Sequence, residues 1–254
     1  MGGKPLINMR IYCPVESITK DKIIVSDKRQ LHHMFSVLRL EEGDRIEVFD
    51  GKSREYECRI NRLCKDKADL AILNTKTAHS FKGVRIALAC ALAKKAKIDF
   101  IIEKATELGV DTVIPLHTQR TVVEVSGVKL GDRLRRWQNI AMEASKQCGR
   151  IHLPKIEPVS EFKDVVLKAK EYELALIPHL GIKNKPLKDI VSKSNAASVI
   201  VFIGPEGDFS EEEIMLAKKN GCREVSLGEL TLKVDTAAIA AVAFLRLYPV
   251  NLRG

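Results

Sequence analysis

The sequence lacks the features that mark membrane, secreted and metal-binding proteins. No uncharged apolar run reaches the ~18 residues of a membrane span, and the best stretch, 236–245, is far shorter. Residues 1–12 contain no apolar signal-peptide core. The six cysteines include no CxxC pair, which argues against a zinc ribbon or a disulfide framework. We therefore expect a cytoplasmic protein with reduced thiols, no metal and no membrane association.

Two further absences argue against a nucleotide-phosphate site and against a site that binds nucleic acid by base stacking. Neither GxGxxG nor GxxxxGK[ST] occurs, so the sequence does not predict a cradle for nucleotide phosphates. Aromatic residues make up 5% of the chain, with Trp137 as the single tryptophan, which does not indicate a base-stacking platform. The chain is 45% hydrophobic and 30% charged, as in an ordinary globular protein. Its 254 residues allow one large domain or two modest ones.

The net charge of +9 is distributed unevenly. Residues 1–80 carry +3, residues 81–160 carry +6, and residues 161–254 are neutral. A basic front half joined to a neutral back half suits a protein that holds a polyanion on one surface and performs chemistry on another. Charge alone leaves nucleic-acid binding and simple basicity both open.

Short strands dominate the first 80 residues. Turn signals such as Glu42-Gly43-Asp44 and Asp50-Gly51-Lys52 separate the strands and predict a small β-barrel. The expected strands are 10–12, 22–25, 45–49, 55–60 and 68–73. A helix over 30–40 would place Leu31, Met34, Phe35 and Leu38 on one face. Residues 77–80 are the expected linker, giving domains 1–80 and 81–254.

The second domain alternates strands and helices, which predicts an α/β fold with a mostly parallel sheet and helices on both faces. Val84–Leu92 is a continuous apolar run, as in a strand buried on both faces. Further strands are expected at 112–116, 173–177, 197–203 and 224–227. The expected helices are 98–108, 130–148, 161–170, 211–220 and 236–247.

Two strand-to-helix connections stand out. Residues 199–213 read VIVFIGPEGDFSEEE, with Ser210 and Glu213 forming a capping box at the helix start. Ligands bind beyond the carboxyl ends of parallel strands, and a β-carbon at Gly207 would be expected to intrude there. Locally the stretch also fits a plain turn. Residues 225–238 read VSLGELTLKVDTAA, with an alanine-rich helix that suits either a partner subunit or a buried position.

Together these stretches resemble the two cofactor-loop motifs of the RsmE family. These are SPOUT-superfamily methyltransferases that modify a uridine at N3 in small-subunit (16S) ribosomal RNA with S-adenosylmethionine. Matching motifs follow in the same order along nearly the whole chain: Arg10-Ile11-Tyr12, His32-His33 with 37–40, Glu42-Gly43-Asp44, Phe49-Asp50-Gly51, 97–109, Pro115-Leu116, Arg120, 137–141 and 143–150.

The resemblance implies a PUA-like barrel, a SPOUT-type parallel sheet with a C-terminal trefoil knot, and a homodimer. It implies the small ribosomal subunit or its RNA as partner. The residues it places around S-adenosylmethionine are Ile203, Gly204, Pro205, Glu206, Gly207, Leu227, Gly228, Leu232 and Thr236. Arg10, His33 and Arg39 lie in the motifs that match the family's barrel and are its candidate RNA contacts. Lys94, Lys95 and Lys97 open a predicted helix, where the dipole disfavours cations, so this string indicates either phosphate contact or a solvated face.

Methylation at uracil N3 requires loss of the N3 proton and stabilisation of the resulting anion. Arg120, Arg150 and Lys233 are the candidate cations, and Glu206, Asp235 or water is the candidate base. The chain departs from the family at Asp208, where a glycine is usual, and at Lys233 and Asp235, where arginine and glutamate are usual. Because Lys233 lacks the planar fork of arginine, these departures bear on substrate contacts.

Two alternatives stay open at this point. One is a SPOUT methyltransferase that acts on another RNA position, such as a ribose 2′-O. The other is a non-catalytic RNA-binding protein of ribosome assembly, for which the changes at Lys233 and Asp235 are the best argument.

Overall fold

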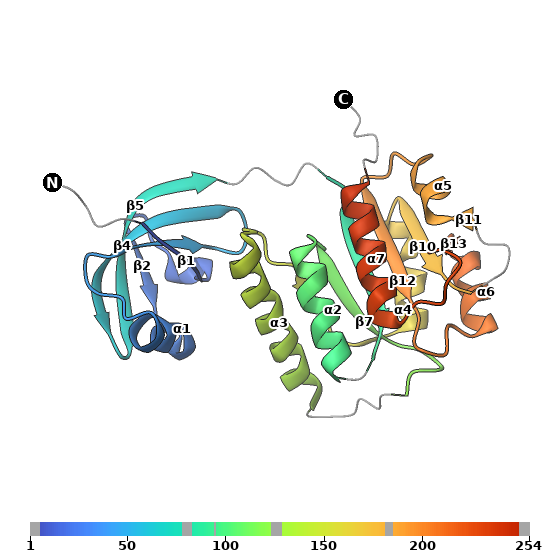
Figure 1. Cartoon of the computed structure of the whole chain (residues 1–254), viewed down its shortest axis with the longest axis horizontal. Coiled ribbons are helices and arrows are strands. Elements are labelled where there is room, and N and C mark those ends of the chain that lie inside the picture. The colour runs from blue at the N-terminus through green and yellow to red at the C-terminus, as the bar shows by residue number, and fades with distance from the viewer. Residues whose placement is uncertain (1–5, 78–82, 94, 123–128, 181–184, 249–254) are drawn as a thin grey trace. The chain divides into compact units, whose positions relative to one another are not determined.

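The chain forms two compact units in a computed structural model. Residues 6–77, 83–93, 95–122, 129–180 and 185–248 are described (Figure 1). The N-terminal unit comprises residues 1–81 and 145–153, and the C-terminal unit comprises 82–144 and 154–254. Residues 145–153 therefore pack with the N-terminal unit although they come much later in the chain. Most of the expected linker, 78–80, lies outside the described residues.

The N-terminal unit is built on a five-stranded sheet of order β1-β3-β4-β5-β2. Its strands are β1 (Leu6–Tyr12), β2 (Lys22–Val25), β3 (Arg45–Phe49), β4 (Arg54–Cys64) and β5 (Lys67–Thr77). β1 and β3 are parallel, whereas the remaining pairs are antiparallel. β4 and β5 extend well beyond their expected bounds, because their outer ends pair with each other as a long hairpin.

The helix expected over 30–40 is a short composite. A single α-helical turn, α1 (Lys28–His32), passes directly into a π-helix, η2 (His33–Val37), and a 3₁₀ turn, η1 (Val15–Ser17), lies earlier in the unit. Leu31 and Met34 are buried as expected, but Phe35 and Leu38 are exposed. The prediction of one apolar face was wrong for these two, since the wider π turn changes the angular spacing of successive side chains.

The turn between β3 and β4 explains the Phe49-Asp50-Gly51 motif. One carboxylate oxygen of Asp50 accepts hydrogen bonds from the backbone N–H groups of residues 52, 53 and 54 at 2.8–3.0 Å. Burial raises the pKa of Asp50, but these hydrogen bonds outweigh it, so the pKa is lowered overall. Gly51 has a φ of 73°, and a β-carbon there would lie 2.8 Å from the Tyr12 ring, which only glycine avoids.

The C-terminal unit contains an eight-stranded parallel sheet, as the alternating pattern predicts. Its strand order is β11-β13-β10-β12-β6-β7-β8, with β9 also paired to β7. The strands are β6 (Arg85–Ala91), β7 (Thr112–His117), β8 (Lys155–Ile156), β9 (Ser160–Glu161), β10 (Leu174–Pro178), β11 (Lys185–Pro186), β12 (Ser198–Ile203) and β13 (Arg223–Ser226). β8, β9 and β11 are two residues long and too short for a sequence pattern to reveal.

Helices cover both faces of this sheet, as expected (Figure 1). They are α2 (Lys95–Glu107), α3 (Lys129–Cys148), α4 (Phe162–Leu167), α5 (Leu187–Val191), α6 (Glu211–Lys219) and α7 (Val234–Leu247), with a 3₁₀ turn, η3 (Ala169–Glu171). The side chains of alternate residues in β12 pack into different hydrophobic clusters. Val199 and Val201 pack in the cluster with α2 and α7, whereas Ile200 and Phe202 pack in the cluster with α4 and α6.

All six cysteines are free thiols, and four of them are buried: Cys13, Cys58, Cys90 and Cys222. Burial raises the pKa of Cys13 to about 11 and those of Cys58, Cys90 and Cys222 to about 12. Because the thiolate is the reactive form, we expect only Cys64 and Cys148 to be alkylated quickly in the native protein at neutral pH. Mass spectrometry after a short alkylation tests this expectation, and rapid labelling of Cys90 would contradict the burial described here.

Candidate active site

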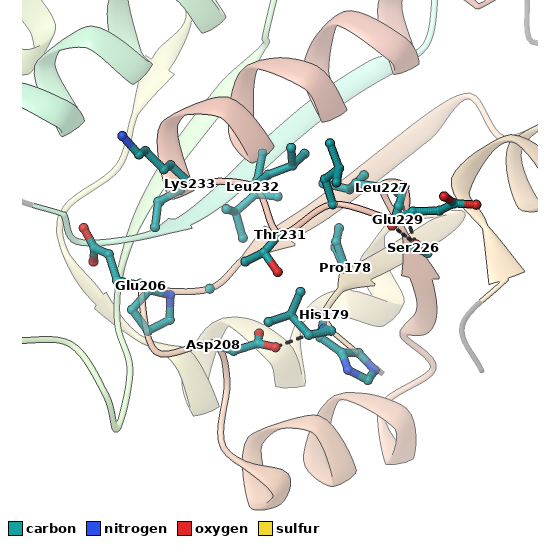
Figure 2. Close-up of a pocket in the computed structure, with 18 residues that line it drawn as sticks. Pro178, His179, Glu206, Asp208, Ser226, Leu227, Glu229, Thr231, Leu232 and Lys233 are labelled. Atoms are coloured by element: carbon teal, nitrogen blue, oxygen red, sulfur yellow. Dashed lines mark hydrogen bonds between the residues drawn. The ribbon is translucent and has the colours of Figure 1, made fainter. Parts of the chain in front are cut away.

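A cavity of about 710 Å³ lies where three neighbouring strands end. β13, β10 and β12 are adjacent in the sheet, so the loops that follow them meet at one edge. The cavity is lined by 178–180 after β10, by 203–206 and Asp208 after β12, and by 226–234 with Ala237 after β13 (Figure 2). Both loops that the sequence singles out therefore form walls of one cavity.

Most of the predicted cofactor residues lie on these walls. Ile203, Gly204, Pro205, Glu206, Leu227, Gly228 and Leu232 line the cavity. Gly207 and Thr236 are described residues that do not line it. A β-carbon on Gly207 would lie 3.5 Å from Cδ of Arg120, an ordinary contact distance, so it would meet this side chain. The expectation that it would intrude on the ligand is not supported by this geometry.

Gly228 is the glycine with the strongest backbone requirement on the cavity wall. Its φ is 136°, a conformation that side-chain-bearing residues rarely adopt, and no heavy atom lies within 4 Å of a β-carbon placed there. The loop after β13 thus needs glycine at this position for its backbone path. Ser226 Oγ donates a hydrogen bond of 2.9 Å to the Gly228 carbonyl and fixes the same turn.

The wall after β10 was missed by the sequence analysis. Pro178, His179 and Leu180 line the cavity, and His179 Nε2 lies 2.9 Å from Oε1 of Glu224. Lys218 and then His179 hold the pKa of Glu224 below its usual range. The only signal in the sequence is that these residues follow a predicted strand. That β10 lies next to β12 is a property of the strand order, which the sequence pattern does not give.

The capping box expected at the start of α6 is confirmed. Ser210 Oγ accepts from the backbone N–H of Glu213 at 3.1 Å, and Oε2 of Glu213 accepts from the backbone N–H of Ser210 at 2.9 Å. The other oxygen of this buried glutamate accepts from the backbone N–H of Gln119, in the segment after β7, at 2.9 Å. One side chain therefore joins the start of α6 to the β7 end of the sheet.

Arg120, a predicted catalytic cation, contacts the backbone of the loop after β12. Its Nη1 donates to the carbonyl of Gly207 at 2.7 Å and to that of Phe209 at 3.4 Å. Arg120 itself does not line the cavity. These bonds to carbonyl groups indicate a role in holding the loop.

Lys233, the second predicted cation, does lie on the cavity wall, and among the described lining residues it is the only lysine or arginine. It is exposed and occupies the N-cap position of α7 (Figure 2). Two residues on, Oδ1 of Asp235 is buried and has no hydrogen-bond partner among the described residues. Asp235 as a whole is partly exposed.

Arg150, the third predicted cation, belongs to the N-terminal unit. Its Nε donates to the carbonyl of His152 at 2.6 Å. The carbonyl of Arg150 itself accepts from Arg10 at 3.4 Å. Arg150 therefore does not belong to the unit that contains the cavity.

The predicted RNA-binding residues have different surroundings. The Arg10 side chain is 10% exposed, pairs with Glu55 at 2.7 Å and lies over the Phe49 ring. These contacts indicate that its guanidinium stabilises the interior of the N-terminal unit. His33 and Arg39 are exposed, and Arg39 has a φ of 51°. Lys95 begins α2, and Lys94 lies outside the described residues.

Lys97, the last of this set, is paired with a residue of the cavity wall. Its Nζ lies 2.7 Å from Oε1 of Glu206, and this hydrogen bond raises the pKa of Lys97. Lys97 therefore connects α2 to the loop after β12.

The described residues contain no group of three or more histidine, cysteine, aspartate or glutamate side chains suited to a metal ion. Within the same residues, no helix has the length and apolar character needed to cross a membrane.

Comparison with protein families gives two matches. A family described as the RNA methyltransferase domain matches residues 81–246, and one described as the RNA methyltransferase PUA domain matches 25–73. Among curated proteins, the chain is 35% identical to ribosomal RNA small subunit methyltransferase E of Synechocystis over 84% of this chain and 69% of that protein. The Bacillus subtilis protein of the same name is 26% identical, over 89% and 90%.

Solved structures give the same result. A methyltransferase from Legionella pneumophila in complex with S-adenosylmethionine superposes with a TM-score of 0.85 at 32% identity, covering 94% of this chain and 97% of that one. Ribosomal RNA small subunit methyltransferase E of Neisseria gonorrhoeae, bound to S-adenosylmethionine, has a TM-score of 0.82 at 28% identity and the same coverage. Motifs, cavity and relatives agree, and the chain belongs to the ribosomal RNA small subunit methyltransferase E family of RNA methyltransferases, the RsmE family that its sequence resembles.

Proposed function

We propose that this protein transfers a methyl group from S-adenosylmethionine to N3 of a uridine in small-subunit (16S) ribosomal RNA. The observation that carries the proposal is the cavity at the ends of β10, β12 and β13, whose walls are the two loops that match the family's cofactor motifs. Relatives of the same fold hold S-adenosylmethionine. Ribosomal RNA as the substrate also supports a cytoplasmic location.

The cavity residues fit S-adenosylmethionine. The volume of about 710 Å³ lies within the ~300–1,000 Å³ of typical small-molecule sites. Ile203, Leu227 and Leu232 offer apolar surface suited to a planar base, and the open space beside Gly228 lets ligand atoms approach the backbone. Exposed N–H and C=O groups of such loops can hold the polar ends of a ligand.

Bound S-adenosylmethionine supplies an electrophilic methyl group on a sulfonium. The chain must then receive an unstacked uracil, accept or conduct away its N3 proton, and stabilise negative charge on O2 and O4. We propose Lys233 for the last task, because it is the only lysine or arginine among the described residues that line the cavity. For the base we propose water, Asp235 or a group brought by the RNA; Glu206 is engaged by Lys97, whereas Asp235 is partly exposed with only Oδ1 enclosed.

The other two cations have different proposed roles. Arg120 acts through the loop whose carbonyl groups it holds, and is therefore a positioning residue. Arg150 is proposed to face RNA from the N-terminal unit, together with His33 and Arg39. The two family matches support the assignment of residues 1–80 to an RNA-binding PUA-like barrel and of 81–254 to the methyltransferase domain, with residues 145–153 of the latter packed in the N-terminal unit. The C-terminal trefoil knot is likewise proposed from the family.

We also propose a homodimer that uses α7. Along this helix Thr236, Ala240 and Leu247 are exposed and uncharged, and Leu247 is 75% exposed. Ala243, which is partly exposed, completes a spacing of four, three and four residues, so these side chains share one face. An uncharged face of small and apolar residues suits close packing against a second copy.

Sedimentation equilibrium tests the dimer. We expect a mass twice the 28.4 kDa of the chain, and a monomer for Ala240→Glu, because the substitution would bury a carboxylate in the interface. Leu167→Glu in α4 is the matched control, since Leu167 is also an exposed apolar residue and lies on a different helix. A parent protein that sediments at 28.4 kDa would contradict the dimer.

Two measurements test the function. Calorimetric titration with S-adenosylmethionine separates a methyltransferase from a non-catalytic assembly protein, which would not bind the ligand. Mass mapping of small-subunit ribosomal RNA from a strain lacking the gene should show one missing base methylation, restored by the parent gene. Loss of a ribose methylation instead would favour the alternative position.

A further inference from the structure

Side chains tie the loop after β12 to three other parts of the C-terminal unit. Lys97 of α2 pairs with Glu206 at 2.7 Å, and Arg120 donates to the carbonyl of Gly207 at the same distance. The third tie is made by Asp208, whose Oδ2 accepts from the backbone N–H of Leu180 at 3.0 Å (Figure 2). Leu180 belongs to the loop after β10, so this bond connects two walls of the cavity.

Asp208 makes this bond from an unfavourable backbone conformation. Its φ is 61°, in the left-handed region that glycine enters freely and that other residues adopt at a cost. The backbone N–H of Asp208 closes a turn onto the carbonyl of Pro205 at 2.9 Å. Its Oδ1 accepts from the backbone N–H of Phe209 at 2.8 Å, which fixes the carboxylate so that Oδ2 faces Leu180.

Both oxygens of one carboxylate are thus engaged by N–H groups from different walls. Glycine at this position would relieve the backbone but would leave both N–H groups without this acceptor. Asparagine tolerates the left-handed region and keeps one acceptor oxygen, but its amide NH₂ cannot accept from the second N–H. The Asp208 side chain therefore joins two walls of the cavity, while its backbone is held in a conformation that glycine would adopt more easily.

We propose that Asp208 is a positioning residue that holds the β10 wall against the β12 wall and so pre-forms the S-adenosylmethionine cavity. The inference rests on the proposed function, because it concerns the same cavity. It predicts that affinity for S-adenosylmethionine and stability of the fold respond differently to substitution of Asp208. A residue that is only structural would change both together.

The test compares Asp208→Gly and Asp208→Asn with the parent, by calorimetry with S-adenosylmethionine and by thermal unfolding. We expect Asp208→Gly to keep the melting temperature of the parent, because relief of the left-handed backbone offsets the lost bonds, while its affinity falls about tenfold. Asp208→Asn should have an affinity between the two. In steady-state assays KM for S-adenosylmethionine should rise while kcat stays close to that of the parent.

Asp132→Asn is the matched control, because Asp132 is a well-exposed aspartate of α3 that pairs with Arg135 away from the cavity. It should bind S-adenosylmethionine as the parent does. If the parent binds and Asp208→Gly binds equally tightly, the inference is overturned while the proposed function stands. If Asp208→Gly loses its fold, Asp208→Asn decides, and parental affinity in that variant overturns the inference. A parent that binds no S-adenosylmethionine overturns the proposed function and the inference with it.

Discussion

Replacing Gly228 by valine should weaken S-adenosylmethionine binding at least tenfold, which corresponds to ~1.4 kcal/mol. At a φ of 136° a β-branched residue is strained, so the loop after β13 must change its path. That loop forms a large part of the cavity wall, and Leu227 and Leu232 would move with it. Calorimetric titration of the folded variant measures the effect.

Gly221→Val is the control for this experiment. Gly221 also has a positive φ, 87°, and no heavy atom lies within 4 Å of a β-carbon placed there. It follows α6 and does not line the cavity. Both variants should therefore lose stability by a similar amount, on the order of 1–2 kcal/mol, but only Gly228→Val should lose affinity. Equal affinity losses in the two variants would show that general destabilisation is the cause.

Replacing Lys233 by alanine should slow methyl transfer by ~10²-fold or more, the usual effect of removing a group that stabilises charge in a transition state. Binding of S-adenosylmethionine should change little, because the proposed task of this cation concerns the uracil anion. Lys233→Arg keeps the charge and should retain most of the activity. Transfer of a tritiated methyl group to small-subunit particles measures the rate.

The control is Lys219→Ala, at an exposed lysine in the last turn of α6 that does not line the cavity. Like Lys233→Ala, this substitution removes one positive charge from the C-terminal unit. It should leave the rate of methyl transfer unchanged. If Lys233→Ala transfers methyl groups at the rate of the parent, Lys233 is only a surface cation, and the stabilising charge must come from elsewhere.

Local sequence signals predicted the parts of the site that local chemistry determines. The apolar run before Gly204 correctly predicted the strand β12. Ser210 and Glu213 correctly predicted where α6 begins, because a capping box is complete within four residues. The two loops were recognised by their motifs. Burial of β6 on both faces was likewise predicted from its continuous apolar run.

Properties that depend on distant residues could not be predicted in this way. His179 and Leu180 reach the cavity because β10 lies between β12 and β13, and strand order is a tertiary property. Arg10 was predicted to bind RNA, but Glu55 and Phe49, far along the chain, occupy its guanidinium. Lys97 was assigned to the same surface, and its partner Glu206 follows it by 109 residues, so this ion pair could not be predicted from the local pattern.

Asp208 shows how a departure from a family pattern acquires a physical reason. From the sequence it was a residue that stands where glycine is usual. The structure shows both features together: the left-handed backbone that favours glycine and a carboxylate that joins two loops. The pattern alone gives the first of these, since the partner of Oδ2, Leu180, lies in the loop after another strand, β10.

The most direct test of this account uses purified protein, S-adenosylmethionine and small ribosomal subunits from a strain that lacks the gene. After the reaction, the RNA is digested and the methylated nucleotide is located and identified by mass spectrometry. We predict a single new methyl group on N3 of one uridine, formed by the parent and greatly reduced with Lys233→Ala. A methyl group on a ribose, on another base, or on no nucleotide of the small-subunit RNA would contradict it.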